Sequence, residues 1–228
     1  MISCVTPVPE RTELILAGSS WYGWVGRAAG SDVYWRAASR SVWGDWDMAV
    51  DNDSRPGEYQ PGGYLIRRLE IADAEELGEL HVAVWRQTYA GMMSEQALAT
   101  MDPVRWGEGW RHRGQSDQAD EATGQRTRIA VHLPTGSLAG FALVGAARDD
   151  DAPVPVQLWA INVLARHHGS GVAEKLLAET LGDQAAYLWV VEQNARAQAF
   201  YRRHGFRTDG GRLRDDELAA DEIRMVRL

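Results

Sequence analysis

The chain has 228 residues, of which 45% are hydrophobic and 25% charged, as in a globular protein with room for one core domain plus an appendage. Its 32 acidic and 24 basic residues give a net charge of -8, which argues against nucleic acid as a partner. A single cysteine, Cys4, excludes an internal disulfide and a cysteine metal cluster. No apolar run reaches the ~20 residues of a membrane helix, and no secretory signal opens the chain, so we expect a cytoplasmic protein without a membrane partner.

The first 62 residues differ in composition from the rest. They contain five of the ten tryptophans without a sustained helical or strand period, namely Trp21, Trp24, Trp35, Trp43 and Trp46. Residues 51–63 are polar and rich in turn formers, as in a linker. The extension is either a tryptophan-rich interaction arm or an irregular, disordered segment from a misassigned start, with Met48 as an internal candidate. We therefore expect an extension over 1–62 and a domain over 63–228.

Regular patterns begin at Tyr64. A strand is predicted over Tyr64–Ile71, and Asp73 and Glu76 have the spacing of a capping box at the start of a helix that ends at Gly91. The predicted buried face of this helix comprises Leu77, Leu80, Val84 and Trp85.

Two more helical stretches follow before the chain turns to strands. One covers 94–101, and the next begins at Pro103 with Asp102 as its N-cap. The polar segment 114–124 is predicted to be a loop.

The second half alternates strands and helices. Strands are predicted over 128–133, 137–147, 156–164, 186–191, 206–214 and 222–228, and helices over 172–181 and 195–204. The strand over 156–164 is apolar almost throughout, so we expect it to be buried on both faces. We expect the three aspartates of the turn before it to be solvated. The predicted fold class is α/β (α+β), a mixed sheet with a parallel β-α-β core at 156–191 and flanking helices.

A short loop with two glycines joins the strand ending at Leu164 to the next helix. Gly169 and Gly171 let a ligand approach the main chain closely, and the open N–H groups of the helix start favour an anion such as a diphosphate. The pair alone is equally compatible with a tight strand-to-helix turn. It is not a Walker loop, and Glu174 breaks the dinucleotide glycine pattern.

A second stretch starts at Asn194, after the strand over 186–191. The following helix presents Ala197, Phe200, Tyr201 and His204 on one face. Tyr201 either packs in the core or reaches a cleft while Phe200 packs in its place.

Together these two stretches resemble the signatures of the GNAT superfamily of N-acetyltransferases. His168 to Ala173 (HGSGVA) is similar to the family pattern (Q/R)-x-x-G-x-(G/A), with His in place of Gln or Arg. The run from Asn194 to Phe206 (NARAQAFYRRHGF) is similar to N-x-x-A-x-x-F-Y-x-x-x-G-F. The resemblance covers roughly residues 64 to 228 and implies a GNAT-like sheet.

The resemblance implies acetyl-CoA as cosubstrate, bound between the two parallel central strands. It implies that the pantetheine arm contacts Asn194 and the main chain of Ile161, Asn162 and Val163. It implies that the diphosphate lies on the loop and helix start formed by His168, Gly169, Ser170, Gly171, Val172 and Ala173. Tyr201 would act as general acid toward the CoA thiolate. Trp85, Tyr89 and Met92 lie where the family lines its acceptor pocket, although an apolar helix face is also typical of a core.

The general base stays unassigned. Many members of the family use a glutamate on the central strand, where this sequence has Gln157, which cannot accept the proton. His132, Glu192 and the aspartates Asp149, Asp150 and Asp151 are the other candidates. No histidine spacing suggests a metal site.

Two functions are therefore weighed. One is an acetyl-CoA-dependent N-acetyltransferase that acts on a primary amine of a small molecule or peptide, by direct attack in a ternary complex. The other is a non-catalytic acyl-CoA-binding sensor or interaction module. By analogy with relatives, a homodimer is compatible with either.

Overall fold

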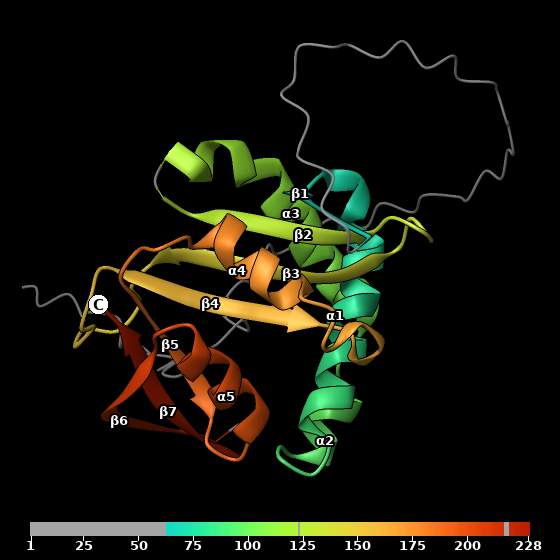
Figure 1. Cartoon of the computed structure of the whole chain (residues 1–228). Helices are drawn as coiled ribbons and strands as arrows, with labels where there is room; N and C mark the ends of the chain where they lie inside the picture. The colour runs from blue at the N-terminus through green and yellow to red at the C-terminus, as the bar shows by residue number, and fades with distance from the viewer. Residues whose placement is uncertain (1–62, 123, 217–218) are drawn as a thin grey trace, which may run out of the picture.

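The computed structural model describes residues 63–122, 124–216 and 219–228 (Figure 1). The interpretations of the tryptophan-rich extension over 1–62, including Met48, lie outside the described residues. The described helices are α1 (Ala74–Tyr89), α2 (Glu95–Ala99), α3 (Pro103–Ala122), α4 (Val172–Thr180) and α5 (Ala195–Arg203). The described strands are β1 (Tyr64–Arg68), β2 (Arg126–His132), β3 (Leu138–Ala146), β4 (Val156–Val163), β5 (Ala186–Val191), β6 (Arg207–Asp215) and β7 (Ala220–Arg227).

The strands form one mixed sheet in the order β1-β2-β3-β4-β5-β7-β6. All neighbouring pairs are antiparallel except the central pair β4 and β5. The predicted α/β fold with a parallel β-α-β core is thereby confirmed. Most predicted elements after Gly124 agree with the structure to within two residues.

Helices cover both faces of the sheet (Figure 1). Adjacent residues on a strand point to opposite faces, and Ile129 packs under α1 and α3 while Ala130 packs under α4. The same alternation separates Phe141 from Ala142 on β3. Further along the sheet, α5 packs over β5 and β7, on the face that carries Ile223. None of the described helices is long and apolar enough to cross a membrane.

The start of α1 differs from the predicted one. β1 ends at Arg68, and residues Ile71–Asp73 form a short 3-10 helix. The Asp73 carboxylate accepts hydrogen bonds from the backbone N–H of Glu70 at 2.8 Å and from Arg67 at 2.7 Å, so it caps the 3-10 turn. Glu76 accepts from the Leu138 N–H at 2.7 Å. The predicted capping box between Asp73 and Glu76 is therefore wrong, because each carboxylate has a nearer backbone donor.

The start of α3 is as predicted, but its end is not. Asp102 accepts a hydrogen bond from the N–H of Val104 at 3.0 Å, which confirms it as the N-cap. The predicted loop over 114–124 is wrong, because α3 continues to Ala122. A β-carbon on Gly114 would lie 3.3 Å from the Ile71 nitrogen, so this glycine permits close packing rather than ending the helix.

Close contact between α1 and α3 depends on Gly78. A β-carbon there would lie 2.3 Å from the Pro103 carbonyl oxygen and 2.7 Å from the Gly107 nitrogen. Alanine favours a helix by up to about 1 kcal/mol over glycine. We nevertheless expect Gly78→Ala to destabilise the protein by about 1–3 kcal/mol, since backbone atoms must move apart. Urea unfolding of the wild type and the variant measures the difference.

Gly109 on α3 supplies the matched control. A β-carbon at this position would meet no atom within 4 Å. Gly109→Ala should therefore stabilise the protein by about 0.5–1 kcal/mol through helix propensity alone. Equal stabilisation by both alanines would show that α1 and α3 do not approach as closely as described.

The central strands β4 and β5 separate soon after they meet. Their register contains one pair, Gln157 with Tyr187. On its other side β4 carries a bulge at Trp159, because Leu143 pairs with Ala160 and Val144 pairs with Leu158. The expectation that this strand is buried on both faces is wrong for residues 159–162, which are half-buried. Beyond Gln157, the β5 side of β4 is an open backbone edge.

Candidate functional site

The loop between β4 and α4 brings free backbone donors to the open edge of β4. Gly171 is the N-cap of α4, and the first backbone bond of the helix runs from Lys175 N–H to its carbonyl at 3.2 Å. Within the described chain, no backbone carbonyl accepts from the N–H of Gly169, Ser170 or Gly171. Together with the helix dipole of α4, these donors favour an anion at this place.

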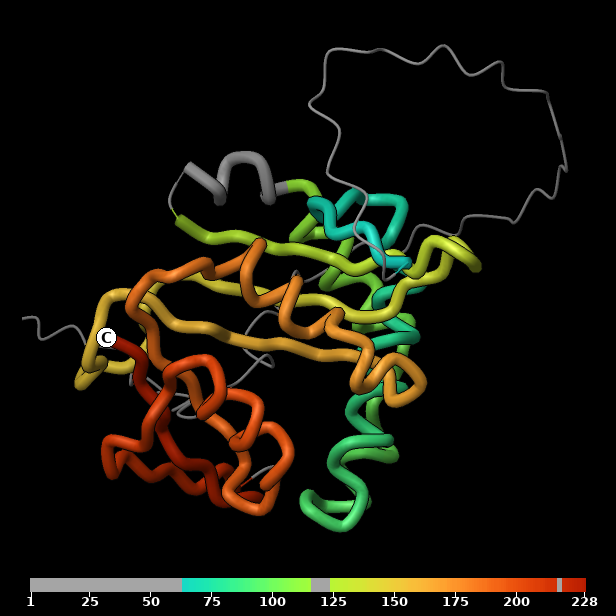
Figure 2. Tube along the Cα trace, viewed as in Figure 1, coloured from blue at the N-terminus to red at the C-terminus, as the bar shows by residue number. Residues whose placement is uncertain are grey.

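The two loop glycines also leave space for a ligand. Gly169 and Gly171 have φ angles of 76° and 82°, in the region that side chains rarely adopt. A β-carbon at either position would meet no atom within 4 Å. The loop therefore has the open cradle and the donor set that a diphosphate needs. Figure 2 traces the path from β4 through this loop and α4 to β5.

His168 bridges the loop to α5. Its Nε2 lies 2.9 Å from the Val163 carbonyl oxygen, and its Nδ1 bonds to Nη1 of Arg196. A carbonyl can only accept and a guanidinium can only donate, so the imidazole carries its proton on Nε2 and is neutral. Burial and the charge of Arg196 lower the pKa of His168, although the bond to Val163 opposes them. The histidine therefore ties the loop to the start of α5.

The other residues expected to contact the cofactor lie near the same opening. Ile161 and Asn162 are half-buried on the free edge of β4, and Val163 is buried. Val172 is buried at the start of α4, whereas Ala173 is half-buried and Ser170 is exposed. Ser170 donates its hydroxyl to the His167 carbonyl at 2.7 Å, which braces the loop from within.

Asn194 lies at the end of β5 and caps α5. The residue is buried, and its side-chain oxygen accepts from the Ala197 N–H at 3.0 Å. Its backbone N–H donates to the Val191 carbonyl at 2.9 Å. These bonds fix the first turn of α5 against the end of β5, and thereby set the direction in which Tyr201 leaves the helix.

Tyr201 is buried on α5, on the side that packs against the rings of Phe200 and Phe206. Burial raises the pKa of its phenol, and so does the charge of Tyr89. The two tyrosines come from helices on opposite faces of the sheet: Tyr201 lies in the cluster that contains Val190, and Tyr89 packs against the cluster that contains Val191. The Tyr201 phenol stays protonated at neutral pH, as a proton donor requires.

The three residues expected in the acceptor pocket lie at the end of α1. Trp85 is buried in a cluster with Val82, Met93, Val191 and Ala220. Tyr89 and Met92 are half-buried at the edge of this cluster. Trp85 thus belongs to the core, whereas Tyr89 and Met92 are partly accessible at its edge.

The residues that the sequence offers as a general base lie in different parts of the structure. His132 lies at the end of β2, two strands from β4, where its Nδ1 lies 2.9 Å from the Thr135 hydroxyl. Glu192 is exposed and forms an ion pair with Arg212 at 2.8 Å. Gln157 is buried and accepts from the Tyr187 hydroxyl at 3.1 Å.

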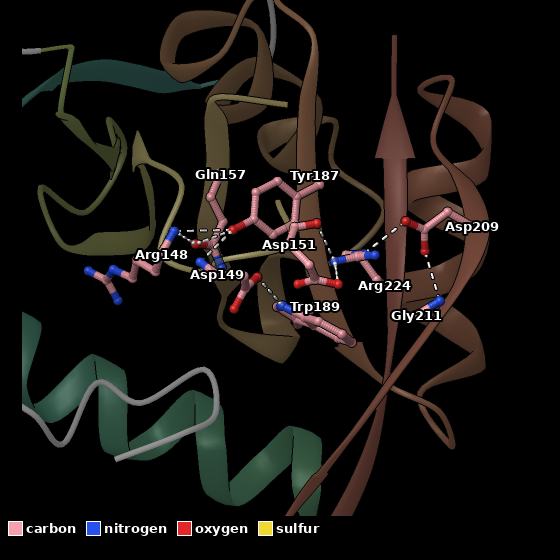
Figure 3. A network of polar contacts seen from close by, with 9 residues as sticks. All are labelled: Arg148, Asp149, Asp151, Gln157, Tyr187, Trp189, Asp209, Gly211 and Arg224. Carbon is pink, nitrogen blue, oxygen red and sulfur yellow. Dashed lines mark hydrogen bonds and ion pairs between the residues drawn. The ribbon is translucent and has the colours of Figure 1, made fainter. Parts of the chain in front are cut away.

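Two of the aspartates before β4, Asp149 and Asp151, belong to a polar network that Figure 3 shows. Asp149 accepts from the Trp189 indole at 2.8 Å. Asp151 pairs with Arg224 at 3.0 Å, and Asp209 accepts from the same guanidinium at 2.8 Å. Asp150 and Asp151 are exposed, as expected of solvated side chains, whereas Asp149 is half-buried. The bonds of Asp149 and Asp151 tie the turn before β4 to β5, β6 and β7.

Sequence reasoning missed one buried carboxylate near Tyr89. Glu222 on β7 is 6% exposed and pairs with Val191, the last residue of β5. Burial and the charge of Glu222 raise the pKa of Tyr89 to about 12. No sequence motif marks Glu222; only the pairing of β7 with β5 brings it to this place. Among the described residues, no three side chains of the metal-binding types gather into a site.

Comparisons with known proteins agree with this arrangement. A family model described as an acetyltransferase (GNAT) domain matches residues 122–208. The Bacillus subtilis protein named "Uncharacterized N-acetyltransferase YuaI" is 25% identical over 135 residues, 57% of this chain and 72% of the relative. The Mycobacterium tuberculosis protein named "Probable N-acetyltransferase Rv2775" is 24% identical over 160 residues, 66% of this chain and 84% of the relative.

Solved structures share the fold. The PaiA N-acetyltransferase of Thermoplasma acidophilum, solved with coenzyme A, has a TM-score of 0.57 at 21% identity and covers 72% of this chain and 98% of its own. The ribosomal-protein-S5-alanine acetyltransferase of Vibrio fischeri has a TM-score of 0.53 at 12% identity, over 75% of this chain and 95% of its own. The family model and the curated relatives thus show similarity to GNAT N-acetyltransferases, and the solved structures show that the chain shares their fold.

Proposed function

We propose that the protein transfers an acetyl group from acetyl-CoA to a primary amine of a small molecule or peptide, by direct attack within a ternary complex. One observation carries the proposal. The loop N–H groups of Gly169, Ser170 and Gly171 follow the end of β4, and Tyr201 packs in the cluster that contains Leu158 of β4. A diphosphate on the loop and a thioester beside Tyr201 would span the open edge of β4.

In this proposal each residue has a defined task. The loop donors and the N-terminus of α4 bind the diphosphate, and the free edge of β4 at Ile161 and Asn162 pairs with the pantetheine. Asn194 uses its side-chain oxygen to cap α5, which directs its amide nitrogen as a donor toward the pantetheine. Tyr201 donates its proton to the thiolate that leaves when the carbon–sulfur bond breaks.

Cofactor binding tests the proposal directly. A β-carbon at position 171 would enter the space assigned to the diphosphate and disturb the loop N–H groups. Gly171→Ala should therefore weaken acetyl-CoA binding at least about tenfold, equal to the loss of roughly 1.4 kcal/mol of binding free energy. Isothermal titration calorimetry measures the dissociation constants.

Gly182 provides the control for backbone strain. It follows α4 at its other end with a φ of 58°, so alanine is strained there too, but far from the loop. Gly182→Ala should lower stability as Gly171→Ala does and leave acetyl-CoA affinity unchanged. Wild-type protein that fails to bind acetyl-CoA at millimolar concentration would refute the proposed function.

A non-catalytic acyl-CoA-binding module is the second candidate, because Gln157 is buried on β4 where a base would be useful. CoA release against a panel of amines separates the two. Tight binding of acetyl-CoA without acetylation of any amine would favour the module.

A further inference from the structure

Glu222 lies on the face of the sheet that the end of α1 covers. Side chains alternate along β7, and Ala220 packs with Val191 in the cluster under α1 and α2. Glu222 follows Ala220 by two residues and pairs with Val191 in the register of β5 and β7. Its carboxylate therefore lies on the same face, at the end of β5 where the strands have separated.

A chain of polar groups connects this position to Tyr201. The charge of Glu222 raises the pKa of Tyr89, and ionisation of Tyr89 would raise the pKa of Tyr201. Tyr89 is half-buried at the end of α1 and packs against the cluster that contains Val191 and Ala220, which are the neighbours of Glu222. An acceptor that enters beside Tyr89 would have a buried carboxylate on one side and the proposed proton donor on the other.

Resting on the function proposed above, we propose that Glu222 is the catalytic base of this acetyltransferase. Its carboxylate would bind the ammonium group of the acceptor and take the proton that must leave nitrogen before attack. The inferred substrate class is accordingly a cationic primary amine.

The other carboxylates of this region differ from Glu222 in their burial or in their distance from the opening. Asp149 and Asp151 lie in the turn before β4, where Asp149 is half-buried and Asp151 is exposed. Glu192 is exposed at the surface. Asp215 is buried on β6, which β7 separates from β5, so it lies further from the opening.

The proposed proton transfers balance. A primary amine has a pKa of about 10.4 by the lysine reference, so it arrives as an ammonium ion. Glu222 takes one proton, and the nitrogen lone pair forms a bond to the thioester carbon. The carbon–sulfur bond then breaks, and Tyr201 protonates the thiolate. The second proton lost from nitrogen restores the phenol, and Glu222 releases the first to solvent. The products are the amide, free coenzyme A and one proton.

Two arginines, on β7 itself and on α1, and Tyr89 keep one protonation state over the pH range of an assay. Arg224, two residues further along β7, is bonded to Asp151 and Asp209. Arg86 on α1 donates to the carbonyl oxygens of Leu98 at 3.3 Å and Met101 at 3.0 Å. Arginine stays charged well above neutral pH, and Tyr89 titrates at about 12. A change in the acidic limb of the rate profile therefore reports on the carboxylate.

The test compares Glu222→Gln with Glu222→Asp and with Asp215→Asn, which removes another buried carboxylate. The acceptors are spermidine, kanamycin and a tetrapeptide with a free N-terminal alanine, and kcat/KM is measured from pH 6 to pH 9.5. For the amine that the wild type acetylates best, kcat/KM of Glu222→Gln should be at least about 100-fold below the wild-type value at pH 7. The ratio of the two kcat/KM values should then fall about tenfold per pH unit, because the fraction of unprotonated amine rises. Glu222→Asp should recover most of the rate, and Asp215→Asn should follow the wild-type profile.

Hydroxylamine, which is uncharged at neutral pH, serves as an acceptor that distinguishes a catalytic base at Glu222 from a structural role of this residue. It needs no deprotonation before attack, so Glu222→Gln should lose far less with it than with the cationic amine. Equal losses with both acceptors, or an unchanged pH profile, would overturn the assignment. Wild-type protein that binds acetyl-CoA but acetylates none of the cationic amines would overturn the substrate class. Failure to bind acetyl-CoA would instead refute the proposed function.

Discussion

Replacing Tyr201 with phenylalanine is expected to lower kcat at least about 100-fold. The CoA thiolate is a poor leaving group unless it is protonated as the carbon–sulfur bond breaks. Tyr201 is the buried phenol beside the open edge of β4, and its raised pKa keeps the proton in place at neutral pH. Phenylalanine keeps the ring contacts with Phe200 and Phe206 and removes only the proton donor.

Single-turnover acetyl transfer and calorimetry together test this expectation. The dissociation constant of acetyl-CoA should stay within about threefold of the wild-type value, a change in binding free energy below roughly 0.7 kcal/mol. Tyr187→Phe is the control, because this tyrosine is also buried and its hydroxyl bonds to Gln157 at 3.1 Å. It should cost stability and leave kcat unchanged. Full activity of Tyr201→Phe would remove the phenol from the mechanism.

The fold was largely predictable because its elements carry local signals. Glycines with positive φ follow α1, α4 and α5 at Gly91, Gly182 and Gly205, where the helices were expected to end or close to it. The exception is Gly114, whose neighbour Ile71 comes from a different part of the chain. The polar composition predicts a loop there. The segment is helical because α3 packs against the 3-10 turn at Ile71, a contact that no local sequence pattern contains.

The two halves of the candidate site differ in the same way. The loop at Gly169 and Gly171 and the run from Asn194 to Tyr201 are each continuous in the sequence, so motif and geometry coincide. The acceptor side depends on which strands pair. Glu222 becomes a neighbour of β5 only because β7 inserts between β5 and β6. A sequence reading finds such a residue only after the strand order is known.

Acidification is expected to destabilise the protein through His81, which is fully buried on α1. Its ring lies among aromatic rings, with centroid distances of 3.9 Å to Trp106, 5.1 Å to Phe141, 5.7 Å to Trp85 and 5.8 Å to Trp110. Burial lowers the pKa of His81 from 6.5 to about 3. Between about pH 6.5 and pH 3 the folded protein therefore holds this imidazole neutral, whereas the unfolded chain protonates it.

The sign follows from proton binding in the two states. Between pH 6.5 and 3 the unfolded chain binds a proton at His81 that the folded chain does not, so the free energy of unfolding falls as the pH falls. The slope approaches about 1.4 kcal/mol per pH unit, and the loss between pH 7.5 and pH 4.5 amounts to about 2–3 kcal/mol. Above about pH 7.5, where the unfolded chain is also neutral at His81, this residue contributes almost no pH dependence.

Leucine at position 81 should remove this dependence, because it has a similar volume and no proton to bind. Urea unfolding at pH 7.5 and pH 4.5 gives the free energy of unfolding for the wild type, for His81→Leu and for His112→Leu, which replaces an exposed histidine on α3. The difference between the two pH values should shrink by about 2–3 kcal/mol in His81→Leu and stay as in the wild type in His112→Leu. Carboxylates add the same acid dependence to all three proteins and cancel in the comparison. An undiminished pH dependence in His81→Leu would mean that the imidazole is protonated, or reached by water, in the folded protein, and the aromatic cluster would then have to open around it.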